Sequence, residues 1–292
     1  MTKTIIITGA NSGLGFETTK QIAQKVPDYQ LVMACRNMQK AAAARDEILQ
    51  DVPDANIILL ELDTSSLAKV RTFVDSFKAL NTPLYGLVCN AGIGGRTVHE
   101  TDDGFNNIFE TNYLGHFLLT QLLLPLMVDN SQIITVSSER HDTPLQGQSW
   151  PGANVLAHGG INESVDAMSY SYSKLCMILF AYKLDHELTT AGKHIAVNTV
   201  NPGLMPETGL AKNKSRFSPA MMTRFADLLS TAVNSATMVT NLICDAKFAN
   251  GPVQYFDRSS DKPVSSSKVS YDAKVQQELW DYSMNAVGLS EK

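Results

Sequence analysis

The sequence predicts an α/β protein in which helices cover both faces of a mostly parallel, doubly wound sheet. Three observations lead to this fold class. Short runs rich in β-branched residues alternate with longer segments of helical spacing. The predicted strands are almost continuously apolar, as expected of parallel strands that are buried on both faces. A glycine-rich turn follows the first strand and leads directly into a helix, which is typical of such folds.

Seven strands are expected, with helices between them. The predicted strands are Thr4–Thr8, Leu31–Cys35, Asn56–Leu62, Leu84–Asn90, Gln132–Ser137, His194–Val200 and Pro252–Phe256. The predicted helices are Leu14–Val26, Met38–Gln50, Leu67–Leu80, Phe105–Met127, Ser169–Thr190, Ala232–Ala246 and Val275–Tyr282. Because strand–helix–strand units of this kind are right-handed, the succession predicts a Rossmann-type fold. We expect a single domain over residues 1–292, because no repeat or linker divides the chain.

Two irregular segments interrupt the alternation. Residues 139–168 are rich in proline and glycine and are predicted to form a long loop. Residues 208–232 are predicted to form irregular helices with Met, Phe and Leu on one side. Since ligands bind beyond the carboxyl ends of the strands in such sheets, we expect the substrate loops at about 139–168 and 204–230. The half that binds a cofactor is then about residues 1–137.

Composition and charge exclude several other classes of protein. The chain has 24 Lys and Arg residues against 29 Asp and Glu residues, which argues against nucleic-acid binding. The longest apolar stretch, Phe117–Val128, is too short to span a membrane and contains Pro125. The start of the chain does not resemble a signal peptide, and the cysteines and histidines lack the spacing of a metal site. We therefore expect a cytoplasmic protein without a metal.

The strongest local signal is the turn after the first strand, Thr8-Gly9-Ala10-Asn11-Ser12-Gly13-Leu14-Gly15. Its glycines permit a tight turn and let backbone N–H groups approach a phosphate at the helix N-terminus. Strand, turn and helix occur in the order that a dinucleotide site requires. The residues expected to hold the pyrophosphate are Gly9, Asn11, Ser12, Gly13, Leu14 and Gly15. The alternative is a plain glycine-rich turn.

The end of the second strand indicates which dinucleotide is bound. A site for NAD places Asp or Glu there, where the carboxylate accepts hydrogen bonds from the adenosine ribose. This chain instead has Cys35-Arg36-Asn37, and a guanidinium can pair with the 2′-phosphate of NADP(H). We therefore predict NADP(H) as the cofactor. An ordinary solvated charge at Arg36 is the alternative.

A candidate for proton transfer lies on the helix predicted at Ser169–Thr190. Tyr170 and Lys174 are four residues apart, so both side chains lie on one face of the helix. A lysine ammonium near a phenol favours the phenolate and lowers the tyrosine pKa. Such a tyrosine can donate a proton to a carbonyl or accept one from an alcohol. Taken alone, the same pair is also common on solvated helices.

Six motifs occur in one order: Thr8-Gly9-x-x-x-Gly13-x-Gly15, Asn90-Ala91-Gly92, Asn112, Ser137-Ser138, Tyr170-x-x-x-Lys174 and Asn201-Pro202-Gly203. In this order the chain resembles the short-chain dehydrogenase/reductase family along nearly its whole length. The resemblance implies that Tyr170 is the general acid/base and that Lys174 lowers its pKa and holds the nicotinamide ribose. It implies that Ser138 stabilises the developing alkoxide. It also implies that Asn112 helps to hold a water that links Lys174 to solvent.

The same resemblance implies further contacts to the cofactor. Asp63 matches the residue that contacts adenine. The residues that would line the cofactor cleft after the fourth and sixth strands are Asn90, Ala91, Gly92, Pro202, Gly203 and Thr208. Of these, Thr208 is the candidate for binding the nicotinamide carboxamide.

A nearer resemblance points to one branch of the family. Met33-Ala34-Cys35-Arg36, Val88-Cys89-Asn90-Ala91 and Thr208-Gly209-Leu210 resemble the light-dependent protochlorophyllide oxidoreductases. Retinol dehydrogenase-like members share the Ala-Cys-Arg stretch. Two departures count against the pigment chemistry: Leu204 stands where the protochlorophyllide enzymes have a cysteine, and Gly92 where they usually have alanine.

These observations lead to one main hypothesis and two alternatives. The main hypothesis is an NADP(H)-dependent enzyme that transfers hydride between nicotinamide and an apolar small-molecule substrate, either a carbonyl or an alcohol. The alternatives are a light-dependent reductase of a C=C bond and an NADP(H)-sensing protein without catalysis. The helices Phe105–Met127 and Ser169–Leu188 would form a homodimer surface in the family, unless their apolar faces are covered within one chain.

Overall fold

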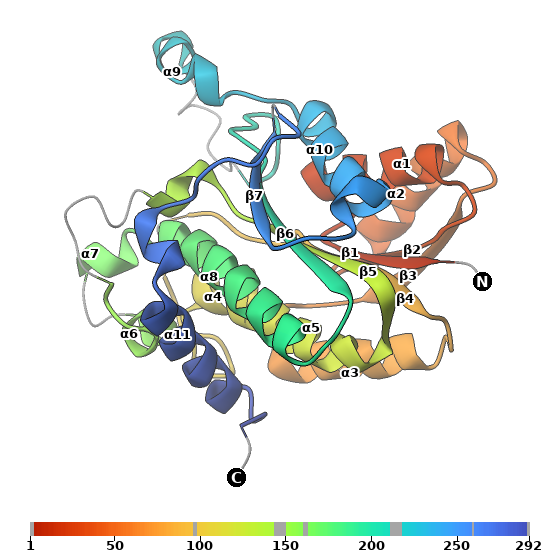
Figure 1. Ribbon diagram of the computed structural model, residues 1–292. Coiled ribbons are helices and arrows are strands. Elements are labelled where there is room, and N and C mark those ends of the chain that lie inside the picture. Colours follow the sequence, from red (N-terminus) through yellow and green to blue (C-terminus); the bar gives the residue numbers. More distant parts are fainter. Residues whose placement is uncertain are drawn as a thin grey trace.

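The computed structural model describes residues 3–95, 98–142, 150–159, 163–210, 218–258 and 260–290. Seven strands form one sheet in the order β3-β2-β1-β4-β5-β6-β7, and every neighbouring pair is parallel (Figure 1). The strands are β1 Thr4–Thr8, β2 Gln30–Cys35, β3 Asn56–Glu61, β4 Leu84–Cys89, β5 Met127–Val136, β6 Ile195–Asn201 and β7 Gln254–Asp257. The predicted α/β fold with a doubly wound sheet is confirmed, and the sheet is parallel throughout.

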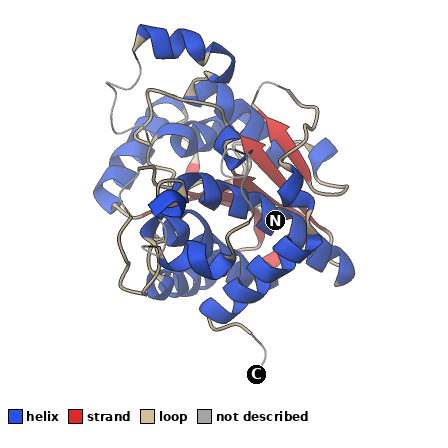
Figure 2. Cartoon of the chain, turned by 90° about the vertical axis from the view of Figure 1, so that its left-hand side faces the viewer, coloured by secondary structure: helices blue, strands red, loops and turns tan. Residues whose placement is uncertain are grey.

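Helices cover both faces of the sheet (Figures 1 and 2). On one face lie α1 Gly13–Lys25, α2 Met38–Asp51 and α10 Ala232–Cys244, and on the other α3 Leu67–Lys78, α5 Gly115–Leu123 and α8 Ser169–Thr190. Successive residues of a strand point to opposite faces. In β1, Ile5 and Ile7 therefore pack into the core under α1 and α10, whereas Ile6 packs into the core under α3 and α8.

The helix predicted at Phe105–Met127 is confirmed over residues 107–126, but it is not one regular α-helix. The segment begins with the short α4 Asn107–Phe109, widens into a π-helical turn at Glu110–Leu114, and continues as α5. A 3₁₀ turn that contains Pro125 then ends the helix, because proline cannot donate the backbone hydrogen bond that an α-helix needs. Strand β5 consequently starts at Met127, earlier than predicted.

The two irregular segments contain short helices. Within 139–168, a 3₁₀ turn spans Glu139–Asp142, and two helices follow, α6 Ala153–His158 and α7 Glu163–Asp166. The prediction of a continuous loop is therefore wrong for these parts, whereas 143–149 and 160–162 lie outside the described residues. The second segment includes α9 Pro219–Arg224, and its residues 211–217 also lie outside the described part.

The C-terminal helix α11, Ala273–Ala286, packs along α8 (Figure 1). The Trp280 ring lies 5.2 Å from the Phe117 ring and 6.2 Å from the Phe180 ring, measured between centroids. Trp150, in the segment before Tyr170, donates from Nε1 to Glu278 of α11 at 2.6 Å. The apolar face of α8 is thus covered from within the chain. No helix among the described residues is long and apolar enough to cross a membrane.

Candidate active site

A cavity of about 420 Å³ lies at the carboxyl ends of the parallel strands. The segments after six strands contribute to its wall: Gly9, Arg36, Asp63, Asn90, Ser137 and Pro202 follow β1 to β6 in turn. Such a crevice is where doubly wound sheets bind ligands. The predicted residues that line it are Gly9, Asn11, Ser12, Gly13, Leu14, Arg36, Asp63, Asn90, Ala91, Gly92, Tyr170, Lys174, Pro202 and Thr208.

The glycine-rich turn has the geometry of a phosphate cradle. Gly9 and Gly13 have φ angles of 65° and 54°, which disfavour any residue with a Cβ atom. A Cβ on Gly15 would lie 2.5 Å from the carbonyl oxygen of Gly9, so this glycine lets α1 pack directly against the turn. The Ser12 side chain makes no capping hydrogen bond, which leaves the first N–H groups of α1 available to an anion. The residues present therefore fit the pyrophosphate of a dinucleotide.

Two cations line the cavity beyond β2. Arg36 follows the strand directly, and Lys40 lies in the first turn of α2, where the Asn37 side chain caps the helix by accepting from the Lys40 N–H at 2.9 Å. The cap fixes the start of the helix and brings both cations to one wall. Lys40 was not predicted, although the Asn37 cap before a helical segment is a signal that could have placed it beside Arg36.

The segment after β4 is tied to the end of β1. Asn90 donates from Nδ2 to the Thr8 carbonyl at 2.8 Å, and the backbone N–H groups of Asn90 and Ala91 both donate to Thr8 Oγ1, at 2.9 and 2.8 Å. These bonds hold the two strand ends at one separation, which fixes the cavity wall between them.

Tyr170 and Lys174 lie together on α8. The Lys174 ammonium is 5.8 Å from the centre of the Tyr170 ring and donates to the Val136 carbonyl at 3.0 Å. Burial lowers the pKa of Lys174 to about 8. Burial also raises the pKa of Tyr170 to about 12; the Glu139 charge adds to the rise, and the Ser138 hydroxyl and Arg140 oppose it. Desolvation therefore dominates the phenol pKa in the protein alone, and the expected effect of Lys174 on it stays a prediction.

Ser138 lies at the end of β5, outside the lining of the cavity. Its hydroxyl donates to Glu139 Oε2 at 3.3 Å and accepts from the Arg140 N–H at 3.2 Å. His141 donates from Nδ1 to the Ser138 carbonyl at 2.7 Å, which anchors the turn. Ser138 thus stands close to the Tyr170 phenol and already has a hydrogen-bonding network of its own.

Asn112 is buried behind the cavity wall, in the π-helical turn before α5. Its Oδ1 accepts from the Ile93 N–H at 2.7 Å, and its Nδ2 donates to the Ile93 carbonyl and to Ser173 Oγ, both at 3.0 Å. The side chain therefore joins the segment after β4 to α8. Its expected role in holding a water stays a prediction.

Gly203 and Thr208 were both expected to line the cofactor cleft, but only Thr208 does so. Gly203 does not line the cavity; it has a φ angle of 75°, and its N–H donates to Asn201 Oδ1 at 2.9 Å. Thr208 does line it and lies over Gly13, where a Cβ would come within 3.3 Å of the threonine methyl group. Gly15, Asn112, Ser138 and Gly203 are thus the predicted site residues that lie outside the lining.

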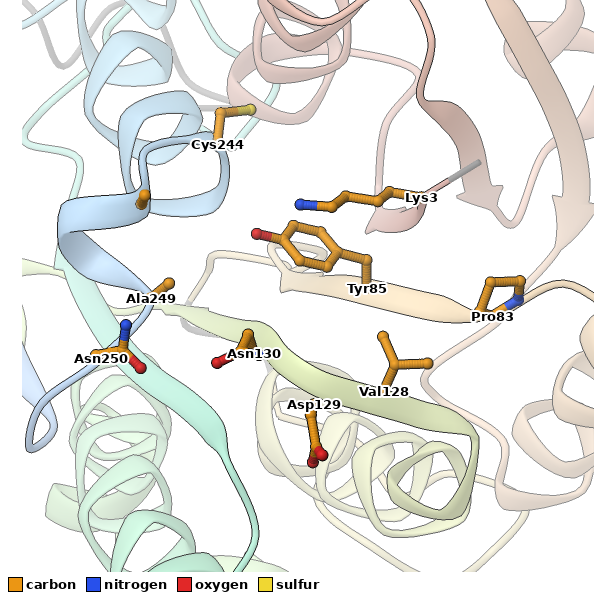
Figure 3. A pocket seen from close by; sticks show the side chains of 10 residues that line it. Lys3, Pro83, Tyr85, Val128, Asp129, Asn130, Cys244, Ala249 and Asn250 are labelled. Carbon is orange, nitrogen blue, oxygen red and sulfur yellow. The ribbon is translucent and has the colours of Figure 1, made fainter. Parts of the chain in front are cut away.

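A second hollow, of about 580 Å³, lies at the opposite, amino-terminal edge of the sheet (Figure 3). Tyr85 of β4 forms part of its wall, and the Lys3 ammonium lies 3.7 Å from the centre of that ring. None of the predicted catalytic or cofactor-binding residues lies there. Within the described residues, no group of three or more His, Cys, Asp or Glu side chains could hold a metal ion.

Comparison with known proteins decides the family. The model of the short chain dehydrogenases matches residues 3–154. The chain belongs to this family. This short-chain dehydrogenase is 32% identical to the polyprenol dehydrogenase of Danio rerio over 98% of its own length and 87% of that protein. Its relatives carry the names of dehydrogenases and oxidoreductases, so it is a member of an oxidoreductase family that uses nicotinamide cofactors. The branch within the family stays a prediction.

Two other matches extend the comparison. The chain is 39% identical to the WW domain-containing oxidoreductase of Gallus gallus. The match covers 72% of this chain and 51% of that relative, so the chain spans about half of the relative's length. A crystal structure of an uncharacterised protein from Mycobacterium paratuberculosis superposes with a TM-score of 0.73 at 29% identity, over 98% of this chain and 93% of the other. The sheet and its covering helices are therefore those of solved relatives.

Proposed function

We propose that this short-chain dehydrogenase is an NADP(H)-dependent reductase of a carbonyl, with Tyr170 as the proton donor. The observation that carries the proposal is the convergence of the glycine cradle, Arg36 and the Tyr170–Lys174 pair on one cavity. When bound, the nicotinamide supplies the hydride that reaches the carbonyl carbon. Every other part of the reaction falls to side chains of this chain.

Arg36 and Lys40 support NADP(H) over NAD(H). The end of β2 has no carboxylate that could accept hydrogen bonds from ribose hydroxyls. Two cations on one wall suit a phosphate monoester, which carries close to two negative charges at neutral pH. Asp63 lines the same cavity, and its Oδ1 accepts from the N–H and hydroxyl of Ser65, which orients the carboxylate that would contact adenine.

The protonation state of Tyr170 is compatible with a proton donor. A pKa raised to about 12 keeps the phenol protonated at neutral pH but also makes it a weaker acid, so donation depends on a charge that stabilises the phenolate. The Lys174 ammonium then lies close enough to stabilise the phenolate that is left. Ser138, beside the phenol, is placed to donate to the same oxygen once its hydroxyl turns from Glu139.

The substrate is proposed to be a small-molecule carbonyl or alcohol with an apolar body. The relative named polyprenol dehydrogenase supports this, since a polyprenol is an isoprenoid alcohol and the two chains match over nearly their whole lengths. Met205 and Leu210, which line the cavity, supply apolar surface near Thr208. A cytoplasmic location is part of the same proposal, because a reducing compartment supplies NADPH.

The test is the oxidation of NADPH, followed by its absorbance, against a panel of aldehydes, ketones, quinones and retinal. Tyr170→Phe is expected to lower kcat by roughly a hundredfold to ten-thousandfold while the Kd for NADPH stays nearly unchanged. Tyr172→Phe is the matched control, since this tyrosine lies on the same helix and is buried away from the cavity lining. Full turnover by Tyr170→Phe would refute the assignment.

A further inference from the structure

His116 lies in the first turn of α5, between the cofactor cradle and the catalytic helix, and is fully buried. Its Nε2 lies 2.9 Å from Thr8 Oγ1, at the carboxyl end of β1. Its Nδ1 lies 3.1 Å from the backbone carbonyl oxygen of Asn112. The imidazole therefore spans the gap between the cradle and the π-helical turn.

The hydrogen bonds of Thr8 determine which imidazole nitrogen carries the proton. Thr8 Oγ1 already accepts from two backbone N–H groups, those of Asn90 and Ala91, and a hydroxyl oxygen has only two lone pairs. A protonated Nε2 of His116 would be a third donor to the same oxygen. Nε2 must therefore be unprotonated and accept the hydrogen of the Thr8 hydroxyl. Thr8 Oγ1 lies 2.9 Å from Nε2 and 3.3 Å from the Val88 carbonyl oxygen, so the bond to Nε2 is the shorter of its two possible donations.

The other nitrogen gives the same answer independently. A carbonyl oxygen can only accept a hydrogen bond, so Nδ1 of His116 must carry the proton that it donates to the Asn112 backbone carbonyl. The imidazole is thus neutral, with the proton on Nδ1. Burial lowers the pKa of His116 to about 4; the bond to the Asn112 carbonyl opposes this decrease, and the Lys174 charge adds to it.

The chain of hydrogen bonds continues from Asn112 to α8. Its side chain bonds both backbone groups of Ile93 and the hydroxyl of Ser173. The Ser173 hydroxyl in turn donates to the Tyr170 carbonyl at 2.7 Å. An unbroken series of polar contacts, buried except for the part-buried Ser173–Tyr170 bond, thus runs from the phosphate turn through His116 and Asn112 to the helix that carries the proposed proton donor.

We propose that His116 is a positioning residue: through Thr8 on one side and Asn112 on the other, it fixes the separation between the cofactor cradle and the Tyr170 helix. This inference rests on the proposed function. Hydride and proton reach the same carbonyl group from these two parts of the protein, so their relative placement determines the rate. A displacement of about 1 Å at such a site costs up to about a hundredfold in rate.

The imidazole state can be tested without cofactor or substrate. Long-range ¹⁵N–¹H correlation spectra of histidine-labelled protein, compared with His116→Gln for assignment, are expected to show a proton on Nδ1 and none on Nε2. The signals should keep this pattern from neutral pH down to about pH 5. A proton on Nε2, or an imidazolium at neutral pH, would overturn the proposal.

The positioning role is tested by three variants. His116→Leu removes both bonds, His116→Asn keeps a donor near the Nδ1 position and loses the acceptor for Thr8, and Thr120→Val is the matched control. Thr120 is also fully buried on α5, and its hydroxyl donates to the His116 carbonyl at 2.8 Å without bonding the cradle. Each variant is compared with the wild type by NADPH affinity, kcat and the primary isotope effect with 4-deuterated NADPH.

For His116→Leu we expect kcat to fall about tenfold to a hundredfold, the NADPH Kd to change less than about threefold, and the isotope effect to rise as hydride transfer becomes rate-limiting. His116→Asn should be intermediate, and it carries the comparison should the leucine variant not fold. Thr120→Val should keep both kcat and the isotope effect. A merely structural role would lower the active fraction and leave the isotope effect unchanged, which would overturn the inference. Absence of any NADPH-dependent turnover in the wild type would instead refute the proposed function, and the spectra would still test the imidazole.

Discussion

Glu110 is a buried carboxylic acid whose protonation should make the stability of the protein depend on pH. The residue is fully buried in the π-helical turn; the Thr101 and Asp103 side chains lie near its carboxyl group, but among the described residues neither carboxyl oxygen makes a hydrogen bond of standard distance and angle. Burial raises its pKa from 4.5 to about 8; the Thr101 hydroxyl opposes this rise, and Asp103 and Asp63 add to it. We therefore choose Glu110→Gln, which keeps the shape of the side chain and has no proton to lose.

The sign and size of the effect follow from linkage. Below about pH 4.5 the carboxyl is neutral in both the folded and the unfolded chain and costs nothing. Between about pH 4.5 and 8 the unfolded chain ionises while the folded chain keeps its proton, so the free energy of unfolding decreases as pH rises. Each pH unit is worth about 1.4 kcal/mol, which gives a ceiling of about 5 kcal/mol above pH 8.

Urea unfolding at a series of pH values measures this difference. Between pH 5 and pH 8, the free energy of unfolding of the wild type is expected to fall by at least about 2 kcal/mol relative to that of Glu110→Gln. This figure is below the ceiling because the structure relaxes around the charge. Other titrating groups are common to both proteins and cancel in the comparison. Glu47→Gln, an exposed change on α2, should follow the wild type. Parallel curves for the wild type and Glu110→Gln would refute the reasoning.

Three further substitutions test other parts of the structure. Arg36→Ala should raise the NADPH Kd about tenfold or more and leave NADH binding nearly unchanged, as measured by fluorescence titration; equal losses for both would contradict the phosphate role. Gly15→Ala places a Cβ 2.5 Å from the Gly9 carbonyl oxygen, so it should lower the free energy of unfolding, measured in urea, by about 1–3 kcal/mol and should weaken NADPH binding. Trp280→Ala removes the ring that covers Phe117 and Phe180 and should lower the free energy of unfolding by about 3 kcal/mol. An unchanged unfolding midpoint would mean that α11 contributes little to the core.

The sheet could be predicted from sequence because its signals are local. Apolar β-branched runs and the cradle glycines depend on neighbouring residues only, so they predict the seven strands and the turn after β1. The interruption at Glu110–Leu114 has no such signal, because apolar spacing continues through the π-helical turn. The short helix α6 depends on a distant partner: Glu278 of α11 accepts from the Ala153 N–H at its start, across 125 residues of sequence.

The candidate site shows the same division. Motif spacing located Tyr170, Lys174 and the cradle, because each motif lies within one turn or one helix. It could not show the connection between them. His116 and Thr8 are 108 residues apart, and only the packing of α5 against the end of β1 brings them into contact.

The Tyr170–Lys174 pair shows why helical spacing alone does not determine the pKa of a side chain. Helical spacing correctly brings the two side chains together, and from that alone a lowered phenol pKa follows. Spacing carries no information about burial, which removes the phenol from water, or about Glu139, which the turn after β5 brings close. Burial also lowers the pKa of Lys174 to about 8, which leaves its side chain mostly charged at neutral pH. The pKa values of the phenol and the ammonium thus depend on tertiary packing, which the spacing of a motif does not encode.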